Sequence, residues 1–278
     1  MKMTNTAEKT ILSANFMQDM IKTTANLYRL GWDERNGGNI SYLLKEQEVA
    51  AFTDVTKTIK TIPLNFKIPD LSHYYFLVTG SGKYFKNIMD EPEENLGIIR
   101  INEAGETADV IWGFSHDTLP TSELPTHLMA HKGRLERDAN HRVVMHTHAT
   151  HMIGMTFTHT LIEKEFTRTL WKMCTECIVV FPEGIGIIPW MIPGTNEIGK
   201  ATAAKMSDVR LVVWPHHGVF GTGNTMDEAF GLIETAEKAA EIYSLADGKI
   251  KQTITDRQLY DLAQTFDVKP REGYLKVN

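Results

Sequence analysis

The chain has 278 residues, of which 42% are hydrophobic and 23% are charged, a composition that suits a globular protein able to bury a large core. Its net charge of −6, with no cluster of lysines or arginines, argues against binding to nucleic acid or to an anionic membrane surface. No stretch approaches the roughly 20 apolar residues of a membrane span. The polar segment 1–10 also lacks the apolar run of a signal peptide, so we expect a cytoplasmic protein with no membrane partner.

The first predicted elements are a helix and a glycine-rich loop. Apolar side chains at helical spacing predict a helix over residues 11–30, which Gly31 would end. The loop RNGGN follows at residues 35–39. Over residues 41–70 the alternation of polar and apolar side chains is too weak to predict strands, and this region has no assignment.

Strands dominate the next part of the chain. Residues 74–78 form a short aromatic and apolar run that ends in the loop TGSG, which is typical of a strand entering a tight turn. The apolar runs 96–101 and 108–114 predict two further strands, which we expect to be neighbours in the same sheet.

Helices and short strands alternate after residue 120. Ser122 can cap a helix over residues 123–138, in which Pro125 is tolerated because amides of the first turn have no partner within the helix. A strand begins at Val143. Proline or glycine bounds three more short apolar runs, which predict strands over residues 177–181, 186–190 and 211–214.

Two sequence patterns typical of capping boxes mark the last helices. Thr225 with Glu228 would open a long helix that ends before Gly248. Thr255 with Gln258 would open a final helix.

The order of these elements predicts the fold class. Several strands interleaved with three or four long helices indicate an α/β protein. The sequence has neither an internal repeat nor a linker rich in proline, glycine or serine. We therefore expect a single domain over residues 1–278.

Histidines gather at two predicted strand ends and suggest a metal site. Residues i and i+2 of a strand face the same side, so His146 and His148 can form a pair of neutral imidazole ligands for zinc. A third ligand is expected from His216 or His217, and their spacing does not choose between them. Three histidines leave one position open, as in catalytic zinc sites. The alternative is that these histidines are solvated or hydrogen-bonded without a metal.

Two glutamates are candidates for acid–base chemistry. Glu123 lies in the segment PTSELP, at the predicted start of a helix, where a carboxylate can also serve only to complement the helix dipole. Glu176 immediately precedes the predicted strand 177–181 and has the weaker case.

Two loops could hold a phosphate group through backbone amides and small polar side chains. They are RNGGN at residues 35–39 and TGSGK at residues 79–83. TGSGK lacks the glycine spacing of a nucleotide-binding P-loop, so the pattern does not predict nucleotide binding. Each loop alone could equally be a plain turn.

The chain has two cysteines, Cys174 and Cys177, in a CxxC spacing. Such a pair can be a redox couple or half of a zinc site. No second CxxC exists to complete a site of four sulfurs, and buried, inert thiols are the simpler interpretation.

Six motifs, in order along nearly the whole chain, resemble the class II sugar-phosphate aldolases and the related epimerases. They are WDERNGGN, TGSGKYF, PTSELPTH, MHTHAT, TECIVVFPEGIGIIPWMIPGT and HGVFGTG. The resemblance implies a three-layer α/β/α domain around a mixed, mostly antiparallel sheet. It also implies a homotetramer with active sites between subunits.

The resemblance also implies roles for individual residues. One zinc ion per subunit would be held by His146, His148 and His217, because the third ligand of the family directly precedes Gly-Val-Phe-Gly. Glu123 matches the catalytic acid/base, and Glu176 would act from a neighbouring subunit. The phosphate site of the family maps onto Asn36, Asn39, Ser81, Gly82, Thr121 and Ser122.

The implied reaction is cleavage of the C3–C4 bond of a ketose 1-phosphate, which gives dihydroxyacetone phosphate and an aldehyde. Glu123 would manage the proton at C3, and Glu176 would serve the aldehyde oxygen. Within the family, a fuculose-phosphate aldolase or a pentulose-phosphate 4-epimerase is the alternative, although PTSELP and the long insert before TGSGK fit these less well. Outside it, the alternatives are a Schiff-base aldolase using Lys83 and a redox or metal sensor built on Cys174 and Cys177.

Overall fold

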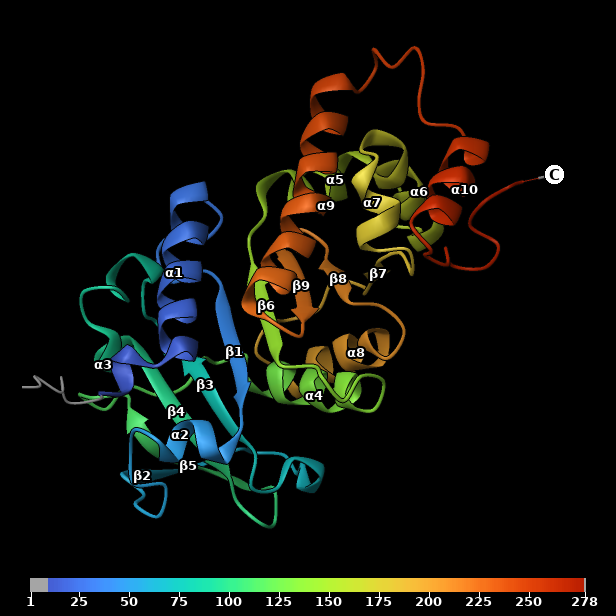
Figure 1. The fold of residues 1–278 in the computed structure, drawn as a ribbon. Coiled ribbons are helices and arrows are strands. Elements are labelled where there is room, and N and C mark those ends of the chain that lie inside the picture. Colours follow the sequence, from blue (N-terminus) through green and yellow to red (C-terminus); the bar gives the residue numbers. More distant parts are fainter. Residues whose placement is uncertain (1–9, 278) are drawn as a thin grey trace, which may run out of the picture.

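The computed structural model describes residues 10–277. The cytoplasmic prediction rested partly on residues 1–10, and all of these except Thr10 lie outside the described residues. Their strands form a single sheet in the order β2-β5-β4-β3-β1-β6-β9-β8-β7 (Figure 1). Neighbouring strands are antiparallel except β7 and β8, which confirms the predicted mixed, mostly antiparallel sheet. The strands are β1 (Asn39–Leu44), β2 (Lys60–Pro63), β3 (Tyr75–Thr79), β4 (Leu96–Ile101), β5 (Thr107–Gly113), β6 (Val143–Thr147), β7 (Gly186–Ile187), β8 (Leu211–Trp214) and β9 (Gly218–Gly223).

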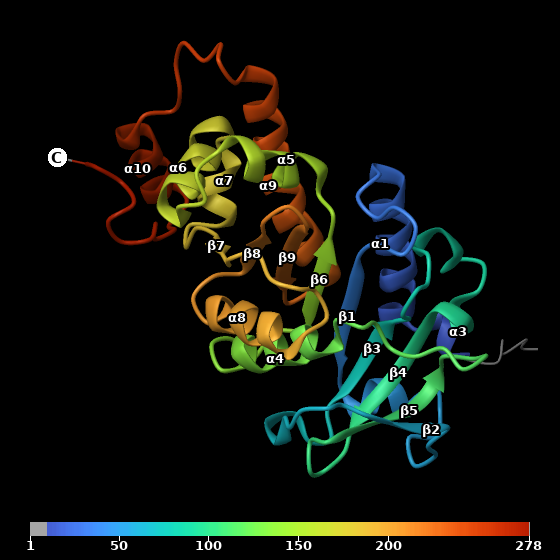
Figure 2. The ribbon, with the colours of Figure 1, turned by 180° about the vertical axis from the view of Figure 1, so that it is seen from behind.

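Helices cover both faces of this sheet. Figures 1 and 2 show α4 and α8 side by side on one face, while α1 and α9 lie on the other together with α5, α6 and α7. None of the helices in the described part of the chain is long and apolar enough to cross a membrane. The helices are α1 (Asn15–Leu30), α2 (Glu46–Ala50), α3 (Pro92–Asn95), α4 (Leu124–Leu135), α5 (Thr150–Thr158), α6 (Glu163–Met173), α7 (Glu176–Val180), α8 (Asn196–Met206), α9 (Met226–Ala246) and α10 (Asp256–Thr265).

The alternation of side chains along β6 shows how the layers are held together. Val143 and Met145 are buried in the core that includes α1 and α9, whereas Val144 is buried in the core formed with α4 and α8. Successive strand residues point to opposite faces, so one apolar strand supplies both cores. The three-layer α/β/α arrangement predicted from the resemblance is therefore present.

The central strand β1 lies in the region left unassigned. Its residues are all buried, and its polar members Asn39 and Ser41 alternate with Ile40 and Tyr42. Because a polar side chain normally marks the exposed face of a strand, this pattern gives no clear signal when both faces are covered. The helices α5, α6 and α8 also lie in stretches for which no element was predicted.

One predicted strand is wrong. Residues 177–181 were expected to be a strand, but Glu176–Val180 form the short helix α7, which packs on α9. Periodicity cannot separate a short apolar strand from one buried turn of helix. The strand predicted over residues 186–190 is limited to β7, and Pro189 follows two residues later, where it cannot donate to a ladder.

Several helix ends also differ from prediction. The first helix begins at Asn15, since residues Ile11–Ser13 form a separate 3₁₀ turn, but it ends at Gly31 in the left-handed conformation, as predicted. In α4 the N-cap position is held by Glu123 and not by Ser122, without a capping hydrogen bond from its side chain, and the helix ends at Leu135, three residues before the predicted end.

The two C-terminal helices begin where the capping patterns placed them. The full reciprocal box is present at Thr255 and Gln258. At α9 the hydroxyl of Thr225 accepts from the amide of Glu228, but the Glu228 carboxylate accepts from the amide of Asn224, one residue earlier than a capping box requires.

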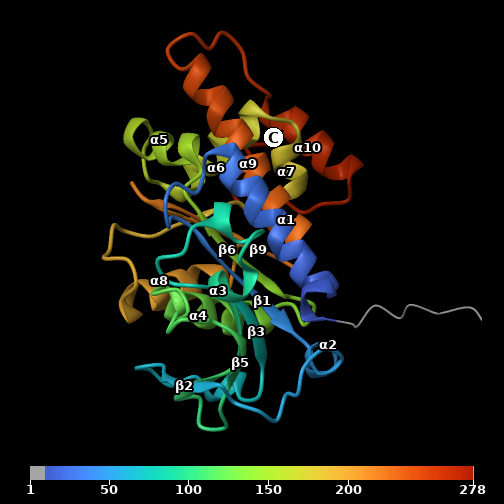
Figure 3. The ribbon, with the colours of Figure 1, turned by 90° about the vertical axis from the view of Figure 1, so that its left-hand side faces the viewer.

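The pairing of β1 with β6 joins two halves of the sheet. Strands β2 to β5 and β1 come from the first part of the chain, and β6 to β9 come from the second. Asn39 lies opposite His146 in this antiparallel pair, at the end of the seam. Figure 3 shows β1 and β6 running beside each other between α1 and α4.

Candidate metal and active site

A cavity of about 300 Å³ opens at this end of the β1–β6 seam. It contains every residue to which the resemblance gave a phosphate or metal role, together with Glu123. The cavity is lined by Glu34, Arg35, Asn36, Gly37, Gly38, Asn39, Gly80, Ser81, Gly82, Thr121, Ser122, Glu123, His146, His148 and His217.

Three histidines from two strand ends meet in this cavity. His146 lies in β6, His148 follows that strand, and His217 lies in the turn between β8 and β9. One nitrogen of each ring lies within 4.8 Å of the corresponding nitrogens of the other two. The i, i+2 spacing of His146 and His148 turns both rings to one side, and the β8–β9 hairpin brings the third ring against them.

The surroundings of the rings leave donor nitrogens free for a metal ion. Nδ1 of His146 donates to the carbonyl of Val219 at 3.0 Å, and its buried Nε2 has no hydrogen-bond partner among the described residues. Nδ1 of His148 lies 3.1 Å from both carboxylate oxygens of Glu34. Such partners fix the tautomer and orientation of a ligating imidazole. A buried nitrogen without a partner beside two other imidazoles fits a metal site.

Burial keeps these imidazoles in the form that binds metal. Desolvation, with help from His217 and His148, lowers the pKa of His146 well below its usual value. Desolvation likewise lowers the pKa of His217 to about 4. Both rings are therefore neutral at physiological pH, as zinc requires of a histidine ligand.

His216 points away from the other histidines. Its Nδ1 lies 3.1 Å from the hydroxyl of Thr156, and its ring packs on Phe157 with centroids 4.2 Å apart. The residue adopts a left-handed backbone conformation with φ of 64°, which turns the two adjacent histidines in different directions. Of the pair, the structure brings only His217 to His146 and His148.

Two glycines allow the backbone to approach the histidines. A β-carbon at Gly37 would lie 2.8 Å from the ring of His148. One at Gly218 would lie 2.5 Å from the carbonyl of Thr147 and 2.9 Å from the ring of His146. The glycines in the RNGGN and HGVFG motifs thus permit close packing around His148 and His146.

Glu123 lies beside the three histidines. Its side chain is buried, and Oε2 is 3.7 Å from Nε2 of His146. The amide of Asn39 donates to the same oxygen at 3.0 Å. Burial raises the pKa of this carboxyl to about 7, with the Asn39 hydrogen bond opposing the shift. A carboxyl with a pKa near neutrality can both take and give a proton.

The loop TGSGK lies beside the segment at residues 119–122, and both line the cavity. A bridge between Gly80 and Pro120 holds these two segments together, and the amide of Ser81 donates to the carbonyl of Leu119 at 2.8 Å. The side chains of Ser81 and Ser122 are thereby gathered at one end of the cavity. Glu34, for which no role was predicted, also lines the cavity, as does Arg35 of the RNGGN loop.

Other candidate residues lie elsewhere. Glu176 is exposed at the first turn of α7, where it accepts from the thiol of Cys174 at 3.0 Å, and it does not line the cavity of its own chain. Lys83 also lies outside the lining, and its ammonium pairs with Glu94 at 2.6 Å.

The cysteine pair gives a simple prediction. Because neither Cys174 nor Cys177 lines the cavity, replacing both with serine is expected to leave the catalytic activity within about twofold of the parent. Steady-state assays with and without an oxidant such as diamide would test this. Loss of cleavage in the double variant would revive the sensor hypothesis.

Comparisons with known proteins found a matching family, similar sequences and a similar structure. The model of the family described as "Class II Aldolase and Adducin N-terminal domain" matches residues 18–244. A rhamnulose-1-phosphate aldolase of Listeria monocytogenes serotype 4a is 61% identical, covering 96% of this chain and 98% of the relative. One from Enterococcus faecalis is 59% identical, covering 96% of each. A sugar-phosphate aldolase from Thermotoga maritima superposes with a TM-score of 0.71 at 27% identity, covering 83% of this chain and 95% of that structure.

Proposed function

The chain belongs to the class II aldolase family, and we propose that it cleaves L-rhamnulose 1-phosphate reversibly to dihydroxyacetone phosphate and L-lactaldehyde, as a step of L-rhamnose catabolism. It is an aldolase, an enzyme of the lyase class. The observation that carries the choice of substrate is the high identity, over nearly the full length, to relatives that bear this name. The cavity, with its three imidazoles, one buried carboxyl and two polar loops, has the groups that this chemistry needs.

We propose His146, His148 and His217 as the ligands of one zinc ion per subunit. Their neutral imidazoles and the partnerless Nε2 of His146 suit that ion. A bound zinc ion would supply Lewis acidity, which stabilises negative charge on the substrate oxygens as the C3–C4 bond breaks. The carbonyl of Val219 accepts from Nδ1 of His146 and holds that ring in place. The carboxylate of Glu34 faces Nδ1 of His148 and does the same for the second ring.

Glu123 is the proposed proton carrier at C3. Cleavage leaves an electron pair at C3 that must take up a proton, and synthesis requires removal of that proton. A carboxyl with a pKa near 7, close to the metal ligands, can serve in both directions. We retain Glu176 as the group that handles the proton of the aldehyde oxygen, contributed by a neighbouring subunit because it is absent from the cavity of its own chain.

A homotetramer would account for that contribution. The exposed side chains of Trp190 and Ile192, 64% and 63% accessible, offer an apolar surface for contact between copies. Sedimentation or light scattering would test the assembly. Glu176→Gln should lower activity and leave the oligomeric state unchanged. We further propose a cytoplasmic location, which cell fractionation would test.

Substrate range is the decisive test of the function. The purified enzyme should release dihydroxyacetone phosphate from L-rhamnulose 1-phosphate faster than from other ketose 1-phosphates, and a coupled dehydrogenase assay would follow it. A preference for L-fuculose 1-phosphate, or epimerisation of a pentulose phosphate without release of a triose, would replace the proposed reaction by one of the alternatives. Trapping of substrate on Lys83 by borohydride would indicate Schiff-base chemistry instead.

The phosphate site makes a separate prediction. Asn36, Asn39, Gly82 and Thr121 line the cavity together with Ser81 and Ser122. Replacing Ser81 with alanine removes a hydroxyl that would bind the phosphate in ground and transition states alike, so KM should rise about tenfold while kcat changes little. The parent should also be poor with unphosphorylated L-rhamnulose. Equal efficiency on the sugar and its phosphate would rule out these loops as the phosphate site.

A further inference from the structure

A buried row of polar side chains runs from Glu123 between α4 and β1. Glu123, His127 and His131 are spaced four residues apart and lie on one face of the helix. Asn39 and Ser41 are two residues apart and lie on the facing side of the strand. The two sets of side chains interdigitate, so the residues of the row come alternately from the helix and from the strand.

Hydrogen bonds join each residue of this row to the next. The amide nitrogen of Asn39 donates to Glu123 at 3.0 Å, and Oδ1 of Asn39 contacts Nε2 of His127. The hydroxyl of Ser41 lies 2.6 Å from Nδ1 of His127 and 2.8 Å from Nε2 of His131. His141, in the loop before β6, continues the row, with its Nε2 2.9 Å from Nδ1 of His131.

The direction of these hydrogen bonds follows from the groups themselves. In its ionised form Glu123 can only accept, so this form requires the NH₂ end of the Asn39 amide. Oδ1 of Asn39 then requires a proton on Nε2 of the neutral His127, whose bare Nδ1 accepts from Ser41. By the same reasoning, His131 and His141 each carry their proton on Nε2. Each donor in the row therefore points toward Glu123.

Neutrality of the three histidines makes this direction well defined. Their side chains are almost completely buried, and desolvation lowers the pKa of His127 and of His141 to about 3 and that of His131 well below its usual value. A doubly protonated ring would donate in both directions and break the order. A row of neutral rings can transmit the orientation from one end to the other.

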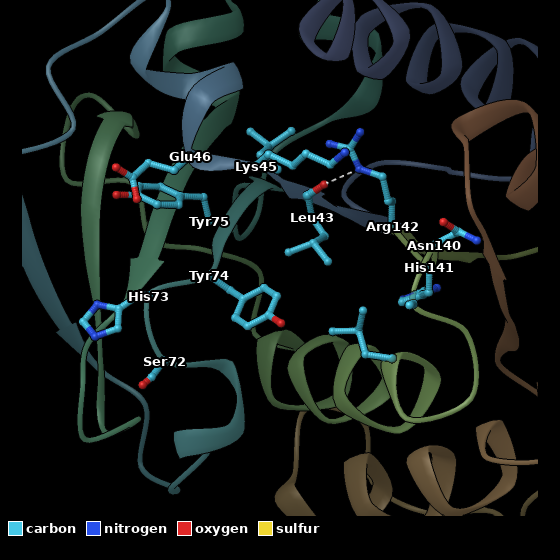
Figure 4. A pocket seen from close by; sticks show the side chains of 13 residues that line it. Leu43, Lys45, Glu46, Ser72, His73, Tyr74, Tyr75, Asn140, His141 and Arg142 are labelled. Atoms are coloured by element: carbon cyan, nitrogen blue, oxygen red, sulfur yellow. Dashed lines mark hydrogen bonds between the residues drawn. The ribbon is translucent and has the colours of Figure 1, made fainter.

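The outer end of the row lies at a second cavity. Figure 4 shows His141 beside Asn140 and Arg142, near α4, at the edge of a cavity of about 460 Å³. His141 itself is 2% exposed, so the row is closed to solvent along its length and ends next to this cavity.

We propose that His127, held by Ser41, His131 and His141, is a positioning residue that fixes the Asn39 amide with its NH₂ group toward Glu123. The inference rests on the proposed role of Glu123. Without His127, Oδ1 of Asn39 loses its donor, so the amide is free to move and the hydrogen bond that holds the carboxylate beside His146 is weakened or lost. Misplacing a catalytic group by about 1 Å can lower the rate about 100-fold.

The first test does not depend on activity. ¹⁵N NMR of the imidazole rings in the intact, metal-loaded protein should show His127, His131 and His141 all as the neutral Nε2–H tautomer, since the chemical shifts of the two ring nitrogens report which one carries the proton. An Nδ1–H tautomer at His127 would overturn the proposal, because Asn39 would then face Glu123 with its carbonyl.

The second test separates positioning from plain packing by a matched pair of variants. His127→Gln retains an N–H near the position of Nε2, whereas His127→Leu removes it. We expect kcat to fall about 10-fold or more in His127→Leu and to recover substantially in His127→Gln, with bound zinc unchanged in both. Thr126→Val, a buried change on the same helix outside the row, is the control and should retain the parental kcat.

Ser41→Ala provides an independent variant in case His127→Leu does not fold. It should lower kcat in the same way and allow His127 to populate both tautomers. Parental kcat in Ser41→Ala, or equal losses in His127→Gln and His127→Leu, would overturn the proposal. If instead the parent cleaves no ketose phosphate while its NMR tautomers are as expected, the proposed function fails and the positioning of Asn39 stands.

Discussion

Removal of the bound metal is expected to reduce kcat/KM for cleavage of the ketose phosphate by about 1,000-fold or more. Lewis-acid stabilisation is worth several kcal/mol, and each 1.4 kcal/mol corresponds to about a factor of ten in rate. Dialysis against a chelator, followed by elemental analysis and assay, would measure the loss. Addition of zinc should restore activity, and full activity in protein shown to be free of metal would contradict the assignment.

Single substitutions locate the metal more precisely. His146→Ala, His148→Ala and His217→Ala should each lose bound zinc, because each would remove one of the three proposed ligands. His216→Ala is the matched control, since this neighbouring ring packs on Phe157 and should leave zinc content unchanged. Loss of zinc in His216→Ala with retention in His217→Ala would reverse the choice between them.

Replacement of Glu123 by glutamine is expected to lower kcat by at least about 100-fold while zinc content stays at the parental level. The change preserves shape but removes the titrating group, and general acid–base catalysis typically contributes about 100-fold to 10,000-fold. A carboxylate that only complements the dipole of α4 would instead contribute about 0.3–1 kcal/mol to stability and nothing to the chemistry.

A partial reaction isolates this step. Exchange of the C3 proton of dihydroxyacetone phosphate with solvent, followed by NMR without aldehyde, requires only the group that acts at C3. Glu123→Gln should exchange this proton far more slowly than the parent. Exchange at the parental rate would exclude Glu123 as the base at C3, and Glu176 or a water molecule would become the better candidate.

The sequence predicted the cavity better than it predicted the sheet around it. Two of the cavity motifs, RNGGN and HGVFG, combine glycines with reactive or polar side chains, and Gly37 and Gly218 are places where the backbone closely approaches the histidine rings. Such local requirements are readable from sequence. The two adjacent histidines could not be separated by spacing alone, because the left-handed conformation at His216 sets their directions.

Errors arose where tertiary context decides the outcome. Strand β1 was missed because Asn39 and Ser41 are polar yet buried, and their partners His127 and His131 lie almost 90 residues away. The strand predicted over residues 177–181 was wrong because the apolar side chains there pack on α9, where one turn of helix buries them as well as a strand would. His127, His131 and His141 likewise gave no signal in the sequence, because only the tertiary structure brings His127 and His131 to Ser41 and His141 to His131.

The seam between β1 and β6 has a consequence for how activity is gained during folding. Asn39 and His146, which face each other across it, are more than 100 residues apart in the chain, and closing so long a loop carries an entropic cost before any contact compensates for it. Each half of the sheet can gain local structure before then, but neither half alone contains all of the three histidines, Glu123 and the two proposed phosphate loops. In refolding experiments, the recovery of helix and strand signals should therefore run ahead of enzyme activity, and catalysis reports specifically on the joining of the two halves.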